Sequence, residues 1–253
     1  MKKNLYYFLL WMLIPGTAFS QKFPEHKEEV AINRGPAILV NMSLGYDEPG
    51  GDLKDRFGSS GNLGGGIEFL TDNNFIFALD GKFRFGNTVI EDPLEILRTE
   101  DGSIIGNDRI LASVSTRQRG VISNVTLGKL FPIGTNRSGI RIAVSGGYWV
   151  HWIRIQDDNN TVTQLTGDYR KGYDRRAAGF ATGQFIGWQH LGANRRANWT
   201  LGLDFQQGFT QGIRAWDFSS MQTLDAKRLD LSFGIRATWI LPFYLKGSEN
   251  IYY

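Results

Sequence analysis

The sequence predicts an all-β protein, a closed antiparallel eight-stranded transmembrane β-barrel with long external loops and short periplasmic turns. Three observations predict this fold. Eight segments alternate apolar and polar side chains with a period of two, as strands with one apolar face do. The connections between these segments alternate long and short along the chain. Aromatic residues gather near both ends of the segments, where the two interfaces of a membrane would lie.

The last expected strand, residues 228–245 (RLDLSFGIRATWILPFYL), shows the pattern most clearly. Every second side chain from Leu229 to Phe243 is apolar, and charges of both signs, Asp230 and Arg236, lie between them. A soluble sheet would turn its polar face to water. Because this strand is long and its apolar face ends in large aromatics, it suits a barrel with lipid outside and a polar interior.

The N-terminus, residues 1–20, predicts an export signal peptide. Two lysines precede the apolar stretch 5–14, and residues 18–20 (AFS) form a small-x-small cleavage site. The apolar stretch is about half the ~20 residues of a spanning helix, so cleavage is expected rather than anchoring. Residues 21–35 are polar and without period, and we expect a periplasmic N-terminal segment there.

Eight strands are expected between residues 36 and 245. In each, apolar side chains occupy one face, and small or polar side chains occupy the other. The sixth strand has the least regular alternation, and which of its faces points outward stays open. The expected strands are residues 36–46, 61–71, 75–89, 113–133, 140–155, 178–191, 199–213 and 228–245.

The connections support the same fold independently. Outer-membrane barrels have short periplasmic turns and longer external loops, and an even number of strands returns both termini to the periplasm. We therefore expect the cell outer membrane as the location, with both termini periplasmic after signal cleavage and residues 246–253 as a periplasmic C-terminal tail. The long loops are residues 47–60, 90–111, 156–177 and 214–227, and the turns are residues 72–74, 134–139 and 192–198.

Aromatic residues form two expected girdles, one at each membrane interface. Aromatic side chains suit this position because they combine an apolar body with, in Tyr and Trp, a polar tip. The girdle residues are Tyr46, Phe75, Phe85, Phe131, Tyr148, Trp152, Trp188, Trp199, Phe209, Trp239 and Phe243.

Composition excludes several other classes of protein. Without the two signal lysines, 26 basic and 25 acidic residues remain, and this formal charge of +1 gives no electrostatic case for nucleic acid. The sequence has no cysteine, so disulfides are excluded. The three histidines, His26, His151 and His190, lack metal-site spacing, and no cofactor or metal is expected.

With these patterns, residues 36–245 resemble the small eight-stranded outer-membrane barrels of the OmpA/OmpX-like architecture. The sequence is also similar in style to uncharacterised outer-membrane proteins of the Bacteroidota type, some of which serve secretion assemblies. The resemblance implies outer-membrane lipid and lipopolysaccharide as partners, and the barrel-assembly machinery during biogenesis. The last strand looks like the signal that this machinery reads, at Ser232, Gly234, Ala237, Trp239, Leu241 and Phe243.

Charged residues are expected inside the barrel, because eight strands enclose a space that their own side chains fill. The signs are nearly balanced, which favours a plug of ion pairs and hydrogen bonds over a narrow ion path or a proton-linked gate. The expected interior charge network consists of Glu68, Asp80, Lys82, Arg84, Arg141, Asp204, Asp230 and Arg236.

The external loop GDYRKGYDRR carries a basic patch of Arg170, Lys171, Arg175 and Arg176. It is either a well-solvated loop or a contact for lipopolysaccharide phosphates or a surface protein, through bidentate guanidinium pairing. His151, near the external end of the fifth strand, is either a hydrogen-bonded filler or part of a catalytic site at the outer rim.

The function expected from these features is that of a non-enzymatic membrane anchor or scaffold for a larger envelope assembly, for example one serving secretion. Its partner would be a periplasmic or surface protein. Two alternatives stay open: a lipid-modifying outer-membrane enzyme, and a narrow, porin-like channel for ions or small solutes.

Overall fold

The computed structural model describes residues 35–133, 137–192 and 197–245. The expected signal peptide, all but the last residue of the expected N-terminal segment, and the expected C-terminal tail lie outside the described residues. Within the described part of the chain, no helix is long and apolar enough to cross a membrane.

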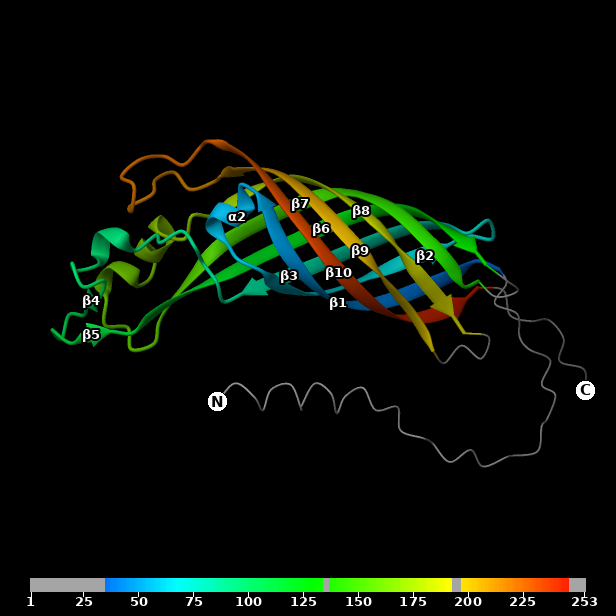
Figure 1. The fold of residues 1–253 in the computed structure, drawn as a ribbon, viewed down its shortest axis with the longest axis horizontal. Coiled ribbons are helices and arrows are strands. Elements are labelled where there is room, and N and C mark those ends of the chain that lie inside the picture. The colour runs from blue at the N-terminus through cyan, green and yellow to red at the C-terminus, as the bar shows by residue number, and fades with distance from the viewer. Residues whose placement is uncertain (1–34, 134–136, 193–196, 246–253) are drawn as a thin grey trace, which may run out of the picture. The chain divides into compact units, whose positions relative to one another are not determined.

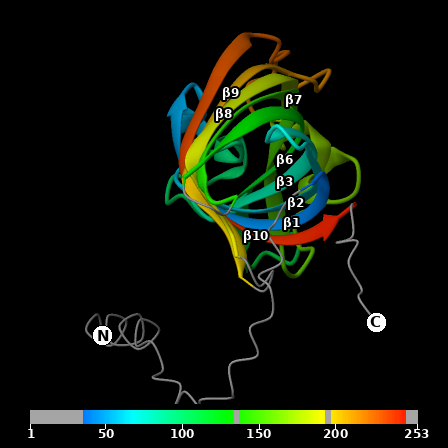
Figure 2. The same cartoon turned by 90° about the vertical axis from the view of Figure 1, so that its right-hand side faces the viewer.

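Eight long antiparallel strands form one closed ring, in the order β1-β10-β9-β8-β7-β6-β3-β2 (Figures 1 and 2). The first strand pairs along its whole length with the last one, from Ala37 opposite Tyr244 to Gly51 opposite Asp230, and this pairing closes the ring. The predicted closed eight-stranded fold is therefore confirmed. The strands are β1 (Ala37–Gly51), β2 (Ser60–Leu70), β3 (Phe75–Gly86), β6 (Val114–Pro132), β7 (Gly139–Asp157), β8 (Ala177–Leu191), β9 (Asn198–Gly212) and β10 (Lys227–Tyr244).

The two ends of the barrel differ in their connections. At the short-turn end, β2 and β3 are joined by a tight turn in which the Asn74 amide donates to the Thr71 carbonyl (3.0 Å). Asn74 has a φ of 63°, which Asn tolerates better than most residues. Ala37 and Tyr244 are paired at this same end. The long-loop end carries α2 (Leu53–Arg56), η1 (Glu95–Leu97), β4 (Ile104–Ile105), β5 (Leu111–Ala112), η2 (Thr163–Leu165) and η3 (Tyr169–Gly172).

The outward side chains of the strands form a nearly continuous apolar belt around the barrel. Ile235 and Val144, for example, expose 58% and 55% of their surface. A soluble protein rarely exposes so large an apolar surface, whereas hydrocarbon solvates it. The belt is formed by large apolar residues on every strand, among them Met42, Leu44, Ile67, Phe77, Leu79, Val125, Leu127, Ile142, Val144, Ile186, Leu203, Phe233 and Ile235.

The first strand is longer than expected. The predicted end at residue 46 is wrong, because Asp47 to Gly51 continue the pairing with β10, opposite Gly234 to Asp230. Pro49 fits there because the pairing of β1 with β2 ends at Asp47, so Pro49 lies in a segment with a single neighbouring strand. The other seven strands begin and end within three residues of their predicted limits.

The structure also settles the facing of β8. Phe185 and Gln189 point inward and are buried, whereas Phe180 and Ile186 point outward. The alternation is irregular because polar residues, among them Thr182 and Gln184, are on the outward face.

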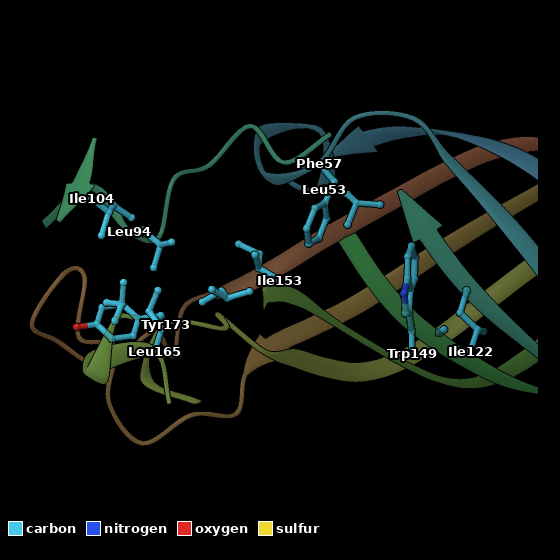
Figure 3. Packing of buried hydrophobic residues seen from close by; sticks show 12 residues of the cluster. Leu53, Phe57, Leu94, Ile104, Ile122, Trp149, Ile153, Leu165 and Tyr173 are labelled. Atoms are coloured by element: carbon cyan, nitrogen blue, oxygen red, sulfur yellow. The ribbon is translucent and has the colours of Figure 1, made fainter. Parts of the chain in front are cut away.

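The barrel interior has apolar packing near both ends. At the short-turn end, one apolar cluster consists of Ala37, Leu39, Leu70, Ile76, Leu130, Leu191 and Ile240. At the long-loop end, a second cluster joins the barrel wall to the loops, with Leu53 and Phe57 near Trp149 and with Leu94, Leu165 and Tyr173 farther out (Figure 3). The loops thereby form a packed cap, rather than independent arms. Polar and charged side chains occupy the space between the two clusters.

Candidate functional site

The interior charge network is centred on a buried ion pair between Glu68 and Arg141. Two guanidinium nitrogens of Arg141 donate to the two carboxylate oxygens of Glu68, each at 2.8 Å. Asn41 also donates to Glu68 (2.9 Å), and Arg141 donates to the side-chain oxygen of Gln189 (3.1 Å). This bidentate geometry gives strong charge-assisted hydrogen bonds, and it neutralises two charges far from water.

A second group lies beside this pair and contains four more of the expected residues. Lys82 forms an ion pair with Asp204, and Arg236 approaches the other oxygen of Asp204 at 3.4 Å. Asp80 accepts a hydrogen bond from the Thr126 hydroxyl (2.7 Å). Each carboxylate in this part of the barrel therefore has a polar partner on another strand, so the side chains tie the barrel wall together across its interior.

The last two expected interior residues, Arg84 and Asp230, lie toward the long-loop end. Arg84 donates to Ser60 (3.0 Å) and lies 3.6 Å from Asp47, and its guanidinium carbon is 4.9 Å from the Trp149 ring centroid. Asp230 accepts a hydrogen bond from Thr210.

Two residues of this region were missed as members of the network. Asp47 was expected in a loop, but it is buried and accepts a hydrogen bond from Asn62 (2.6 Å). His151 was expected as a hydrogen-bonded filler or as part of a catalytic site, with no partner named, and its Nε2 lies 2.8 Å from Asp230. Extending the two-residue period of β1 by one step would have placed Asp47 inside.

Little free space remains among these interior side chains. Two cavities between them have volumes of about 20 and about 10 Å³. Since a buried water needs about 10–15 Å³, each cavity has room for about one water molecule, which is far less than a hydrated ion requires. The geometry is that of a filled barrel.

All eleven aromatic residues expected in the girdles lie on the eight strands with their side chains on the outward face. Trp152 is partly covered by Arg176, whose guanidinium carbon lies 5.4 Å from the ring centroid. Near the short-turn end, the ammonium of Lys129 lies 4.4 Å from the Phe75 ring centroid.

The structure does not bring the four residues of the expected basic patch together as one surface. Arg175 is directed at Glu91, with which it forms an ion pair, and Lys171 pairs with Asp168 (2.5 Å). Arg175 and Arg176 both line a cavity of about 120 Å³ at the long-loop end, whereas Arg170 and Lys171 line a separate groove.

Glu91 joins two segments of the cap. It accepts a hydrogen bond from Arg56 of α2 (2.7 Å) and pairs with Arg175 of the loop after β7. Burial by itself would raise the pKa of Glu91, but Arg56 and Arg175 outweigh that effect and hold the pKa below its ordinary value of 4.5. Glu91 is therefore ionised at neutral pH and stabilises the contact between these segments.

The described histidines do not assemble a metal or catalytic centre. His151 is 1% exposed and is enclosed by Phe57 and Trp149. His190 lies 3.2 Å from the Ser138 hydroxyl, but that hydroxyl also accepts a hydrogen bond from the Leu191 amide, as a residue that supports the turn would do. Among the described residues, no group of three or more potential ligands is placed to hold a metal ion.

No protein-family model matches the chain, and no curated protein matches it significantly. Solved structures with a similar arrangement include the attachment invasion locus protein Ail of Yersinia pestis (7% identity, TM-score 0.45), covering 82% of this chain and 99% of that chain. Neisserial surface protein A (NspA) has 11% identity and a TM-score of 0.40, covering 82% of this chain and 99% of its own. A deletion mutant of the TodX monoaromatic hydrocarbon channel has 6% identity and a TM-score of 0.33, covering 83% and 91%.

Similarities this low carry no argument about activity or partners, and the fold assignment rests on the strand pairing itself. Eight strands close in a ring, the apolar belt faces outward, and the charged side chains are enclosed. Together these features make the chain an eight-stranded β-barrel of the small outer-membrane type.

Proposed function

We propose that this protein is a non-conducting anchor in the outer membrane, whose long-loop end faces the outside and presents the packed cap to a protein partner. The observation that carries the proposal is the sealed interior. Both carboxylate oxygens of Glu68 accept hydrogen bonds from Arg141 in the middle of the barrel, and an apolar cluster lies on either side of this pair along the barrel axis. A conducting barrel would need a continuous polar path instead.

The hairpin formed by β4 and β5 supports a role in binding a partner. Ile105 and Leu111 are paired in this hairpin and expose 55% and 68% of their surface, and Ile110 beside them is also exposed. These apolar side chains belong to a loop, so the bilayer that covers the belt does not cover them. Exposed apolar clusters of this kind are typical of protein interfaces.

Two measurements test the proposal. In planar bilayers the purified full chain should give no conductance steps, and regular steps would overturn the sealed anchor. A photo-crosslinking residue at Ile105, in cells that make the protein natively, should give a discrete protein adduct, with the exposed loop residue Asp101 as the control position. Equal labelling at both positions, or no labelling at Ile105, would overturn the proposal that a protein partner binds the cap.

The enzyme alternative gains no support from the site. Of the two described histidines, His151 is the one at the long-loop end, and its buried contact with Asp230 leaves it without access to a lipid substrate. We expect His151→Ala to leave the composition of lipid A unchanged, as measured by mass spectrometry of lipid extracts. A changed lipid A profile in that variant would contradict a non-enzymatic role.

A further inference from the structure

The outward face of β6 and β7 carries arginines at the long-loop end. Arg117 and Arg119 alternate with the buried Gln118 in β6, and Arg154 lies between the buried Ile153 and Ile155 in β7. The strand register places Arg117 directly opposite Arg154, and Arg119 directly opposite Trp152. We call Arg117, Arg119, Arg154 and Trp152 the basic face.

These three arginines have no acidic partner in the described chain, unlike the interior arginines Arg84, Arg141 and Arg236. Within the described residues, no carboxylate lies within ion-pair distance of Arg117, Arg119 or Arg154. Arg119 donates to the main-chain oxygen of Gln118 (2.6 Å), which leaves its charge uncompensated. Like charges directly opposite each other across two strands destabilise a sheet. The basic face therefore carries an electrostatic cost that a bound anion would remove.

A groove beside the basic face adds space and further positive charge. It has a volume of about 410 Å³ and is lined by Trp152, Arg154, Arg170 and Lys171, with Asp174 and Arg214. Arg214 pairs with Asp174, and Lys171 pairs with Asp168. Arg154 and Arg170 thus remain as unpaired cations at the groove, close to the aromatic surface of Trp152.

The height of the basic face on the barrel indicates the kind of anion. On the outward face of β7, every residue from Ile140 to Val150 is apolar, a tyrosine or a glycine. Ten residues at about 3.4 Å each, tilted by about 40°, span about 26 Å along the barrel axis, which is close to the apolar band of about 25 Å of such barrels. Trp152 follows at the interface, and Arg154 lies at the level of the lipid head groups.

We infer that the basic face binds the phosphate groups of a phosphorylated glycolipid in the adjoining leaflet, with Trp152 packed against the sugar or the start of an acyl chain. The guanidinium fork of Arg pairs with two phosphate oxygens at once, and several such pairs would hold one lipid in place. This inference rests on the proposed function in one respect, namely that the long-loop end faces the outer leaflet.

The test compares two triple variants by native mass spectrometry of the full chain with diphosphorylated lipid A. One variant is Arg117→Gln, Arg119→Gln and Arg154→Gln. The control is Lys54→Gln, Arg109→Gln and Lys227→Gln, which removes three exposed positive charges elsewhere at the long-loop end. We expect the first to lower lipid occupancy at least about tenfold, because charge-assisted hydrogen bonds are lost, and the control to bind as the wild type does.

Two further arms identify the ligand. Dephosphorylated lipid A should bind the wild type as weakly as lipid A binds the first variant. Inorganic phosphate at the same concentration should not displace the lipid. Equal lipid occupancy in the two triple variants, or equal binding of dephosphorylated lipid A, would overturn the inference. Displacement by inorganic phosphate would mean that the site takes free phosphate and not a lipid.

Failure of this inference can be distinguished from failure of the proposed function. Conductance and crosslinking at Ile105 report on the sealed anchor and its partner, and neither measurement involves the basic face. Heat-modifiable migration on gels shows whether each triple variant forms a closed barrel, so that a loss of lipid is compared only between folded proteins.

Discussion

Arginines inside this barrel and arginines on its outward face at the long-loop end have opposite environments. Inside, Arg141 is held by both oxygens of Glu68, and Arg84 lies near Asp47. Outside, Arg117 and Arg154 are paired across two strands, and no carboxylate of the described chain lies within ion-pair distance of either. A charge removed from water must be neutralised within the protein, whereas a charge at an interface can be neutralised by the molecule that borders it. The interior arginines therefore stabilise the fold, whereas the outward arginines are available to a ligand.

The largest expected effect comes from breaking an interior pair. Glu68→Gln leaves the Arg141 charge buried without its carboxylate, and we expect a loss of about 3–5 kcal/mol in the free energy of unfolding. The double variant Glu68→Met with Arg141→Met removes both charges and should be far closer to the wild type. Denaturant unfolding in lipid vesicles measures the unfolding free energy of both variants. A Glu68→Gln variant as stable as the wild type would show that the interior charges are not structural.

The second-largest effect is expected in the apolar belt. An arginine placed at Val144 or Ile235, near the middle of the bilayer, should cost about 2–4 kcal/mol of unfolding free energy. The same change at Leu229, close to the long-loop end of β10, should cost far less because the guanidinium reaches the interface there. The same unfolding assay applies, and equal costs at both depths would contradict the membrane placement.

A smaller, pH-dependent effect is expected at Glu91, because its contacts with Arg56 and Arg175 are partly open to water. Because the folded state lowers the pKa of Glu91, its stabilising contribution is complete above pH 4.5 and is lost as the pH falls from 4.5 through the folded pKa. The protection factors of the α2 amides, which correct hydrogen exchange for the pH dependence of its intrinsic rate, should therefore fall on acidification in the wild type. In Glu91→Gln these protection factors should already be low at neutral pH and should change little over that window. If α2 protection changed with pH in the same way in the wild type and in Glu91→Gln, the contact of Glu91 would not be the cause of the pH dependence.

The smallest effect is expected on the outward face. Arg117→Gln removes the repulsion from Arg154 and should leave stability unchanged or raise it by about 0.2–1 kcal/mol in lipid-free detergent. The measurement is again denaturant unfolding, with Lys54→Gln as the control. A loss of more than 1 kcal/mol would mean that Arg117 has an unrecognised role within the fold.

Much of the barrel could be predicted because each strand obeys one simple rule. Apolar and polar side chains alternate wherever one face meets lipid and the other meets the interior, and this rule placed seven strands within three residues. It failed at Asp47 to Gly51, where Asp, Pro and Gly predict a turn locally, although pairing with β10 keeps the segment extended. It was also ambiguous at Thr182, which meets its hydrogen-bonding need through Gln207 on the neighbouring strand (3.2 Å).

The sites could be predicted less well than the strands. Which charges point inward follows from the period of two, but which carboxylate each one meets depends on the ring order and the register. The contact of Glu91 with Arg56 and Arg175 joins loops far apart in the sequence, and no local pattern encodes it. The opposition of Arg117 and Arg154 likewise becomes visible only once β6 and β7 are aligned.

The pairing of β1 with β10 has a consequence for how this molecule is made. The amides and carbonyls of β1 find their partners on β10, which is synthesised about 180 residues later. In the hydrocarbon layer, water cannot form hydrogen bonds with the unpaired backbone groups of an open sheet edge. A chain that stops before residue 227 lacks β10, and β1 then has no strand with which to close the ring. Biogenesis must therefore hold the earlier strands in an unclosed state until β10 has been synthesised. A nonsense mutation that removes only the last strand should send the entire product to proteolysis.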